Sequence, residues 1–504
     1  MANEVKPQLK LKRLGIDTYR EAVIYMRSDC YICESEGFEA QARIKVSIKD
    51  DYFIIATLNT ISDSILNPGE VSLSEYAWEL LGAQEGDIIT VSHPEPLESF
   101  SYVRGKIFGK TFTSNQLNEI IRDVVAGRYS DILISSFLTA CAGDHLSQAE
   151  IAMLTESMTN VGGRIVWPNK LIVDKHCVGG LPGNRTSLIV VPIVAAYGLT
   201  IPKTSSRAIT SSAGTADTME TLAPVDLSFT DMQKVVEREN GCIVWGGSVS
   251  LSPADDILIR VEKAIDLDSE GQLVASVLSK KISAGSNHIL IDMPIGDTAK
   301  VRSEEQGSIL KQYLENVGKK LGIKVKVLFT DGSQPVGRGI GPALEAYDVL
   351  SVLQGKKGAP SYFRERSLEL AGRVLEFSSD VKSGTGKMIA QKILDSGEAW
   401  KKFQSICDAQ GGMREPPIAE FTYPVLAKRK GIVKAIDNRR IARLAKLAGA
   451  PQNKAAGVYL QIALHIEVEE DQPLFTIHAE SKGELNYALD YANANIDIIT
   501  IEEK

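Results

Sequence analysis

The sequence predicts an α/β multidomain protein, because short apolar strands alternate with helical segments over most of its 504 residues. A chain of this length is too long for one hydrophobic core and indicates two to four domains. We expect an N-terminal β-barrel-like domain, a small helical domain, a large α/β domain with a mixed sheet, and a C-terminal α+β domain.

The N-terminal domain, residues 1–100, is predicted to be rich in strands. Polar and apolar residues alternate over 42–46, and apolar runs at 53–56 and 88–91 are typical of buried strands. Pro94 and Pro96 then mark the end of the domain.

The helical domain is predicted to combine residues 101–170 and 225–263. Thr113 or Ser114 is suited to cap a helix whose apolar residues recur at helical spacing. Ser147 and Glu150 form a capping box in front of a second helix.

The α/β domain is predicted to combine residues 171–224 and 264–425, and the C-terminal domain to span 426–504. Strands are expected near 171–173, 199–201, 289–292 and 325–329. Gly337, Gly339 and Gly341 follow the last of these, and we favour a structural turn there over a ligand-binding loop.

Charge and composition limit the classes of partner. The net charge of −8 argues against a nucleic acid polymer, and an apolar run of the length needed to span a membrane is missing. The N-terminal residues lack the apolar core of a secretory signal, so we expect a cytoplasmic protein. Cys30 and Cys33 form a lone C-x-x-C pair, for which structural or incidental thiols are favoured over metal or redox use.

The most informative stretch is DKHCVGGLPGNRTS, residues 174–187. An apolar strand leads into a glycine-rich loop and a helix start, an arrangement that presents backbone N–H groups to an anion. Lys175 adds a positive charge, so phosphate is the expected ligand. The loop has neither P-loop nor dinucleotide-binding spacing, and by itself it is equally compatible with a structural turn.

A second strand and loop favour the anion site. The run SSRAITSSAGT, residues 205–215, supplies hydroxyls and an arginine, which donate hydrogen bonds to negative charge. Because neighbouring strands of an α/β sheet deliver their loops to one crevice, Lys175 and Thr215 should face a common phosphate-binding mouth.

These two loops resemble the signature of the thymidine/pyrimidine-nucleoside phosphorylase family, in DKHCVGG followed by TS and in SSRAITSSAGTADTME. The resemblance extends over roughly residues 105–504 and is strongest to the longer branch, which includes archaeal AMP phosphorylases and has a comparable N-terminal domain. It implies a pentosyltransferase that needs inorganic phosphate as co-substrate and no metal or other cofactor. It also implies a homodimer.

The resemblance also implies roles for individual residues. Asp268 would be the general acid for the leaving base, and His176 would line the base or sugar, or serve only structurally. Phosphate ligands would be Lys175, Ser187, Ser205 and Thr215, with Cys177 in place of the usual serine as a weaker donor. Substrate contacts would come from Gly180, Ser206, Arg207, Ala208, Ile209, Thr210, Ser211, Ser276, Lys280 and Lys300.

Departures from the thymidine phosphorylase pattern bear on the substrate. Ser206, Thr210 and Ser211 replace a glycine and a Gly-His pair, and hydroxyls beside Arg207 suit a 5′-phosphate. We therefore expect phosphorolysis of a nucleoside 5′-monophosphate of the AMP type, or of a nucleoside, giving free base and a pentose 1-phosphate.

Three alternatives stay open. One is a true thymidine phosphorylase. Another is a transferase like anthranilate phosphoribosyltransferase, which would need carboxylates for magnesium-bound diphosphate, and only Asp217 and Glu220 are available in the loops. The third is a non-catalytic nucleotide-binding protein.

Overall fold

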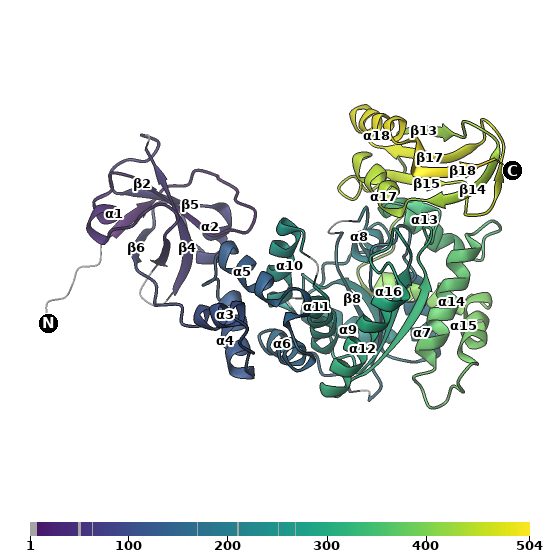
Figure 1. Ribbon diagram of the computed structural model, residues 1–504, viewed down its shortest axis with the longest axis horizontal. Helices are drawn as coiled ribbons and strands as arrows, with labels where there is room; N and C mark the ends of the chain where they lie inside the picture. Colours follow the sequence, from purple (N-terminus) through teal and green to yellow (C-terminus); the bar gives the residue numbers. More distant parts are fainter. Residues whose placement is uncertain are drawn as a thin grey trace. The chain divides into compact units, whose positions relative to one another are not determined.

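The computed structural model describes residues 8–48, 52–62, 64–168, 170–208, 211–249, 251–267 and 269–503 (Figure 1). It divides into two compact units, residues 1–140 and 141–504. Asp268, Ile209 and Thr210 lie outside the described residues. The domain limits expected from the sequence stay a prediction, because this division alone does not test them.

The first unit begins with a closed six-stranded barrel in the order β1-β5-β2-β4-β3-β6. Alternating side chains such as Ile44 and Val46 fill its interior. The barrel elements are β1 (Gln8–Leu11), β2 (Val23–Arg27), α1 (Tyr31–Glu36), β3 (Arg43–Ile48), β4 (Tyr52–Ile61), β5 (Glu70–Leu73), α2 (Glu75–Leu81) and β6 (Ile88–Ser92).

Three helices follow in this unit: α3 (Phe100–Ile107), α4 (Ser114–Val125) and α5 (Asp131–Cys141). Thr113 caps α4 and forms a capping box with Gln116, which confirms the helix start expected at 113 or 114. The apolar face of α4, including Leu117 and Ile121, is buried.

The second unit opens with a 3-10 turn (Gly143–His145) and α6 (Gln148–Asn160). The Ser147 hydroxyl accepts from Glu150 N, and the Glu150 carboxylate accepts from Ser147 N, so the predicted capping box is confirmed. Helix α6 packs against α11 (Glu270–Ser283).

The strands of the α/β part all pair in parallel. They are β7 (Val173–Cys177), β8 (Ile201–Ser205), β9 (Gly241–Trp245), β10 (His288–Ile295) and β11 (Lys324–Asp331). One sheet has the order β11-β10-β7, another pairs β8 with β9, and a bridge between Ile172 and Thr200 joins them in parallel. The strands expected near 171, 199, 289 and 325 are thus confirmed within a few residues.

The mixed sheet expected here is not found among these five strands. At least one helix separates each of these five strands from the next one along the chain, and a helical crossover lets the following strand run in the same direction. Residues 241–245, which the sequence placed in the helical domain, form β9 and pair with β8. The cause is the apolar composition of this segment, which suits a buried parallel strand.

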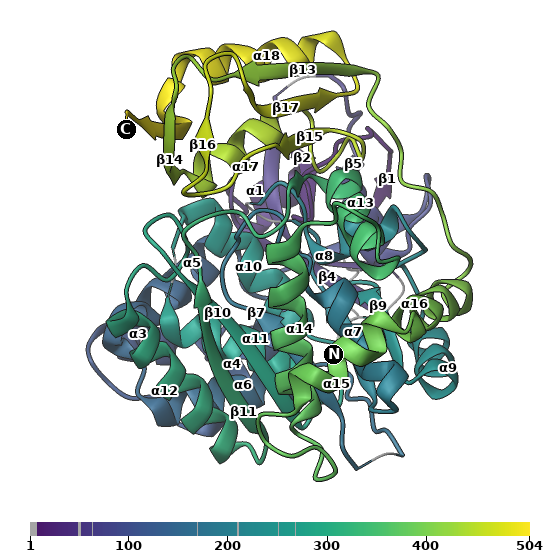
Figure 2. The same cartoon turned by 90° about the vertical axis from the view of Figure 1, so that its right-hand side faces the viewer.

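Helices cover both faces of the β11-β10-β7 sheet. Helix α12 (Glu304–Lys320) packs on β11, and α14 (Ser361–Leu375) packs on β10 and β7. Figure 2 shows β10 and β11 running between these two helices. The remaining helices of this part are α8 (Thr215–Glu220), α9 (Phe229–Glu239), α10 (Pro253–Ile265), α13 (Pro342–Leu353), α15 (Gly386–Asp395) and α16 (Glu398–Ala409).

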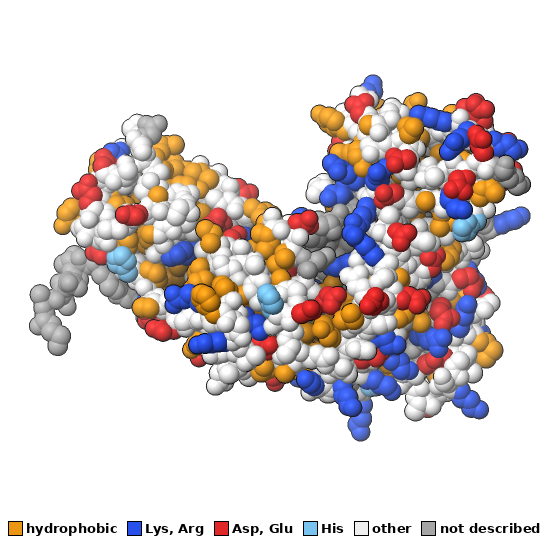
Figure 3. All heavy atoms as spheres, viewed as in Figure 1, with side chains coloured by type: hydrophobic (Ala, Val, Ile, Leu, Met, Phe, Trp, Pro, Cys, Tyr) orange, Lys and Arg blue, Asp and Glu red, His pale blue; other side chains and the backbone are white. Residues whose placement is uncertain are grey.

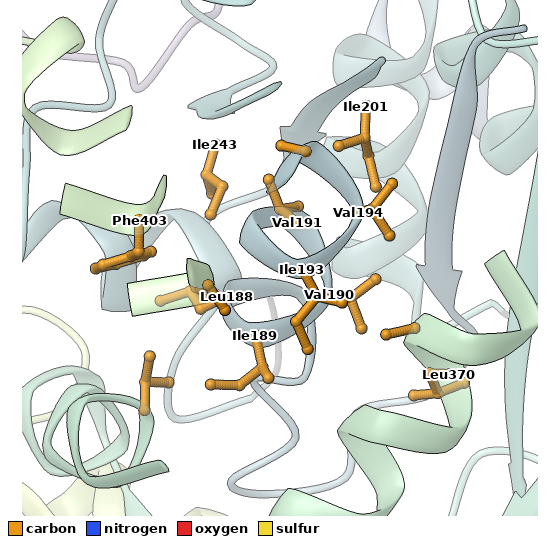
Figure 4. Packing of buried hydrophobic residues seen from close by; sticks show 14 of the residues in the cluster. Leu188, Ile189, Val190, Val191, Ile193, Val194, Ile201, Ile243, Leu370 and Phe403 are labelled. Atoms are coloured by element: carbon orange, nitrogen blue, oxygen red, sulfur yellow. The ribbon is translucent and has the colours of Figure 1, made fainter. Parts of the chain in front are cut away.

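Helix α7 (Ser187–Tyr197) lies at the centre of the largest core. Its residues 187–195 are all buried, so it has no polar face and must be surrounded by other elements. Figure 4 shows Phe403 of α16, Leu370 of α14 and Ile201 of β8 packed around it. This packing fixes the helix whose N-terminus ends the glycine-rich loop.

The C-terminal part contains two small sheets and two helices. One sheet has the order β12-β15-β17-β13 and the other β16-β14-β18. Its elements are β12 (Gly339–Ile340), β13 (Phe421–Leu426), β14 (Gly431–Ile436), α17 (Asn438–Leu447), β15 (Gly457–Leu460), β16 (Glu467–Val468), β17 (Pro473–Ala479), α18 (Lys482–Ala494), a 3-10 turn (Ile496–Ile498) and β18 (Ile499–Glu502).

The glycines after β11 have a packing role. Gly183 of the glycine-rich loop has φ +67°, and a Cβ there would lie 2.8 Å from the backbone N of Gly337. The close approach of the two backbones explains glycine at both positions, as expected for a structural turn.

Charged side chains of both signs lie on the surface. Figure 3 shows acidic and basic side chains interspersed over the visible face. Within the described ranges, the structure contains no helix with the length and apolarity required to traverse a bilayer.

Candidate active site in the α/β part

Strand β7 distributes its polar side chains to two sides by simple alternation. Asp174 and Lys175 are adjacent, yet they contact different sets of partners because successive side chains of a strand point in opposite directions. Lys175 Nζ lies 3.4 Å from a carboxylate oxygen of Asp292 and donates to Thr186 Oγ1 at 2.7 Å. The ammonium therefore lies at the base of the glycine-rich loop.

Asp292 on β10 is the buried counter-charge on this side. It also pairs with Arg366 at 3.1 Å and accepts from Thr330 at 2.6 Å. Burial opposes its ionisation, but Lys175 and Arg366 outweigh this and lower the pKa of Asp292. The carboxylate therefore stays charged and holds Lys175 in place.

Cys177 is a neutral thiol at this site. Burial and the nearby Asp292 carboxylate raise its pKa to about 12. Its Sγ accepts from Asn184 Nδ2 at 3.1 Å and donates to Gly179 O at 3.7 Å. The protonated thiol thus contacts the glycine-rich loop, and its proton is donated to the Gly179 carbonyl.

Asp174 organises the other side of β7. Its carboxylate lies 2.7 Å from Lys281 Nζ and 3.6 Å from Lys203 Nζ. The Nζ atoms of both lysines also donate to the carbonyl of Thr204. Burial lowers the pKa of Lys203 well below its usual range, although Asp174 acts in the opposite direction. Burial, reinforced by Lys281 and Lys203, also lowers the pKa of His176, so its imidazole is neutral.

The second loop carries Arg207, whose guanidinium is already paired. It makes two hydrogen bonds to Glu220, at 2.7 and 2.8 Å, and stacks over the Trp245 ring. Lys454 from the C-terminal part lies 2.9 Å from the same carboxylate. These two cations lower the pKa of Glu220 to about 2, with Arg207 the larger influence. Arg207 therefore borders the site as one member of an ion-pair network.

The two loops meet at a cavity of about 280 Å³. Lys175 and Thr215 both line it, so the two loops face one cavity as the sequence predicts, while phosphate binding there stays a prediction. The predicted site residues that line this cavity are Lys175, His176, Cys177, Gly180, Ser187, Ser205, Ser206, Arg207, Ser211, Thr215 and Lys280.

Three predicted residues lie beside the cavity. Ser276 accepts from Lys280 Nζ at 3.1 Å, and Lys280 pairs with Asp255 at 2.7 Å. Ala208 N donates to Asp217. Lys300 packs on Gly179, where an added Cβ would lie 2.8 Å from that of Lys300.

The sequence prediction missed several residues that line the cavity. The main ones are Asn184, Arg185, Lys203, Trp245, Asp256 and Lys281. A signal for Lys203 was available, because it lies two positions before Ser205 and thus on the same face of β8. Trp245 and Asp256 come from a segment that gave no such signal.

Several groups could bind an anion. Ser187 is the first residue of α7, where a helix end carries partial positive charge. The Oγ of Ser205 is buried and has no hydrogen-bond partner among the described residues. A buried hydroxyl without a partner is unfavourable unless a ligand supplies one.

Metal ligands do not cluster in the part of the chain that the structure describes. Asp217 and Glu220, the one acidic pair in the loops, are both in contact with Arg207 and Lys454.

Comparison with known proteins agrees with this geometry. Residues 101–162 match the helical bundle domain of a glycosyl transferase family, and residues 169–400 match the a/b domain of the same family. Residues 432–499 match the pyrimidine nucleoside phosphorylase C-terminal domain. A Legionella pneumophila protein named "Putative thymidine phosphorylase" is 62% identical over 98% of this chain and 96% of its own length.

The chain belongs to the pyrimidine nucleoside phosphorylase family. Proteins of the same name from Polaromonas sp. and Hahella chejuensis are 58% and 55% identical to this chain. Each match covers 98% of this chain, together with 97% of the Polaromonas protein and 98% of the Hahella protein. The likeness therefore includes the N-terminal barrel region.

A solved structure shares the fold of part of the chain. Anthranilate phosphoribosyltransferase from Thermus thermophilus superimposes with a TM-score of 0.51 over 61% of this chain and 98% of that chain. At 18% identity the likeness concerns the fold alone. In the chain described here, Asp217 and Glu220 are held in ion pairs with Arg207 and Lys454.

Proposed function

We propose that the protein cleaves the N-glycosidic bond of a nucleoside 5′-monophosphate, or of a nucleoside, with inorganic phosphate. The products would be the free base and a pentose 1-phosphate. The observation that carries the proposal is the lining of the cavity. Among the described residues that line it, the basic side chains are Lys175, Arg185, Lys203, Arg207, Lys280 and Lys281, and the acidic side chain is Asp256. Such a lining favours an anion.

Phosphorolysis requires phosphate below the anomeric carbon and a sugar fixed above it. The transition state resembles an oxocarbenium ion that faces the phosphate, so positioned donors and charges supply most of the acceleration. Lys175, Ser187, Ser205 and Thr215 would hold the phosphate. Lys175 would act as a fixed positive charge, because Asp292 and Thr186 hold its ammonium.

The leaving base must gain a proton or be relieved of negative charge. Asp268 is the proposed general acid, on the family resemblance. His176 would donate or accept one hydrogen bond as a neutral imidazole, since burial and two lysines keep it unprotonated. Lys280, held by Asp255 and Ser276, would contact the substrate.

A nucleoside 5′-monophosphate is the substrate class we favour. The hydroxyl-bearing residues Ser206 and Ser211 line the cavity beside Arg207. Thymidine phosphorolysis is the second candidate, because the closely similar relatives carry that name.

The test is release of free base from AMP, CMP, UMP and thymidine, each with and without phosphate, in buffer containing a metal chelator. We expect phosphate-dependent release from at least one nucleotide, unaffected by the chelator. Release from thymidine alone would rule out the nucleotide version. Release that needs magnesium, or that proceeds without phosphate, would rule out the phosphorolysis proposal.

A further inference from the structure

Arg185, between the glycine-rich loop and α7, connects the glycine-rich loop to the second loop of the cavity. Its Nε donates to Glu345, its Nη2 donates to Ala213 O at 2.6 Å, and its Nη1 donates to Thr215 Oγ1 at 3.4 Å. The last two partners belong to the second loop and the start of α8. The guanidinium thus joins the two segments on which the proposed phosphate ligands lie.

Glu345 of α13 is hydrogen-bonded to both the glycine-rich loop and α8. It is 1% exposed, and its carboxylate accepts from Gly183 N at 3.3 Å in the first loop and from Thr218 Oγ1 at 2.9 Å in α8. One buried carboxylate therefore bonds to the first loop twice, through Gly183 and Arg185, and to α8 once.

The contact with Arg185 also orients the Thr215 hydroxyl. A hydroxyl has one proton to donate and two lone pairs to accept with. Because an oxygen lone pair of Thr215 accepts from Arg185, the proton of Thr215 points away from the guanidinium. Thr215 lines the cavity, so its proton is available to an anion there.

We propose that Arg185 and Glu345 are positioning residues that hold the two loops in register and direct the Thr215 proton toward bound phosphate. This inference rests on the proposed function, since it assigns the phosphate site to the two loops. This role is assigned to Arg185 because its Nε donates to Glu345, its Nη2 to Ala213 O in the second loop and its Nη1 to Thr215 Oγ1 at the start of α8.

The first test uses variants that keep the buried ion pair. Thr218→Val removes the hydroxyl that bonds Glu345 and preserves the side-chain shape. Thr221→Val is the matched control, because Thr221 is also buried and its hydroxyl donates to Thr218 O at 2.8 Å rather than to Glu345. Phosphate binding is measured by calorimetry on the full chain, with inorganic phosphate as the probe.

We expect Thr218→Val to weaken phosphate binding about 2- to 30-fold, the range for residues that act on a site through others. Thr221→Val should leave the phosphate Kd within about 2-fold of the original. In steady-state assays the KM for phosphate should rise with Thr218→Val while the KM for the nucleotide changes little. Equal weakening by both variants would overturn the inference.

The second test removes the ion pair. Arg185→Met alone or Glu345→Gln alone leaves an uncompensated buried charge and should lower Tm strongly. Combining them removes both charges and retains an amide oxygen for Gly183 N, so the Tm of the double variant should exceed that of either single variant. Its phosphate Kd should still be about 10- to 100-fold weaker, because the loops are no longer aligned.

The outcomes separate the two proposals. A double variant that binds phosphate as tightly as the original chain would show that the pair is only structural. An original chain that binds no phosphate and releases no base would instead refute the proposed function. If the double variant does not fold, the comparison of Thr218→Val with Thr221→Val decides.

Discussion

Ser205→Ala separates a phosphate-binding hydroxyl from a structural one. The Oγ of Ser205 is buried at the cavity and has no hydrogen-bond partner among the described residues. In the unliganded protein that hydroxyl costs about 1–3 kcal/mol, because its hydrogen bonds to water are lost on burial. Replacing it with a methyl group removes this cost, so the Tm without phosphate should stay constant or rise.

Phosphate binding should change in the opposite direction. A hydrogen bond to a charged group contributes about 1.5–3 kcal/mol, and the loss of one corresponds to a Kd about 10- to 150-fold larger. The assay is calorimetric titration with inorganic phosphate, supported by the rise in Tm that phosphate produces. The KM for phosphate should rise by a similar factor.

Ser286→Ala is the matched control. Ser286 is also buried, its Oγ also lacks a partner among the described residues, and it does not line the cavity. This variant should keep the phosphate Kd while its Tm stays constant or rises. A Ser205→Ala protein with a phosphate Kd within about 2-fold of the original would refute the assignment of Ser205 as a ligand.

Three further predictions concern stability. Burial raises the pKa of Asp348 from 3.8 to about 6. Ionisation of this carboxyl therefore destabilises the fold as the pH rises from about 4 to above 6, and the free energy of unfolding falls by about 3 kcal/mol when ionisation is complete. Asp348→Asn, which stays neutral, should therefore raise Tm at pH 8 and not at pH 4, and a gain that is equal at both would contradict the assignment. Gly183→Ala should lower Tm and weaken phosphate binding, because the added Cβ would meet the backbone of Gly337. Gly198→Ala should affect only Tm, because Gly198 has φ +101° and no atom lies close to the added Cβ. Phe403→Ala should cost about 3–5 kcal/mol in denaturant unfolding, since Phe403 is fully buried against α7, and a loss below about 1 kcal/mol would contradict that packing.

Local sequence was sufficient to predict the two loops that line the cavity and the helix caps. The caps at Thr113 and Ser147 depend on residues three positions apart, which form the same hydrogen bonds whatever the rest of the fold does. Likewise, a strand that carries Lys175 and leads into a glycine-rich turn is a local pattern that can be read from the sequence. The roles of these residues in binding stay predictions until the experiments above are done.

What the sequence alone determined about this protein is the position of four of the five parallel strands, β9 being the exception, and of two of the segments that line the cavity, because hydrophobic periodicity and glycine placement act over a few residues. Only the tertiary structure decided the charge state and partners of the cavity side chains. Arg207 was predicted to grip the substrate, but the fold pairs it with Glu220, which Lys454 from the C-terminal part also contacts. Lys175 and Asp292, and Arg185 and Glu345, are distant in sequence and meet in the interior. Burial and ion pairing depend on such three-dimensional neighbours, and they set which groups are charged, which are neutral and which remain available to a ligand.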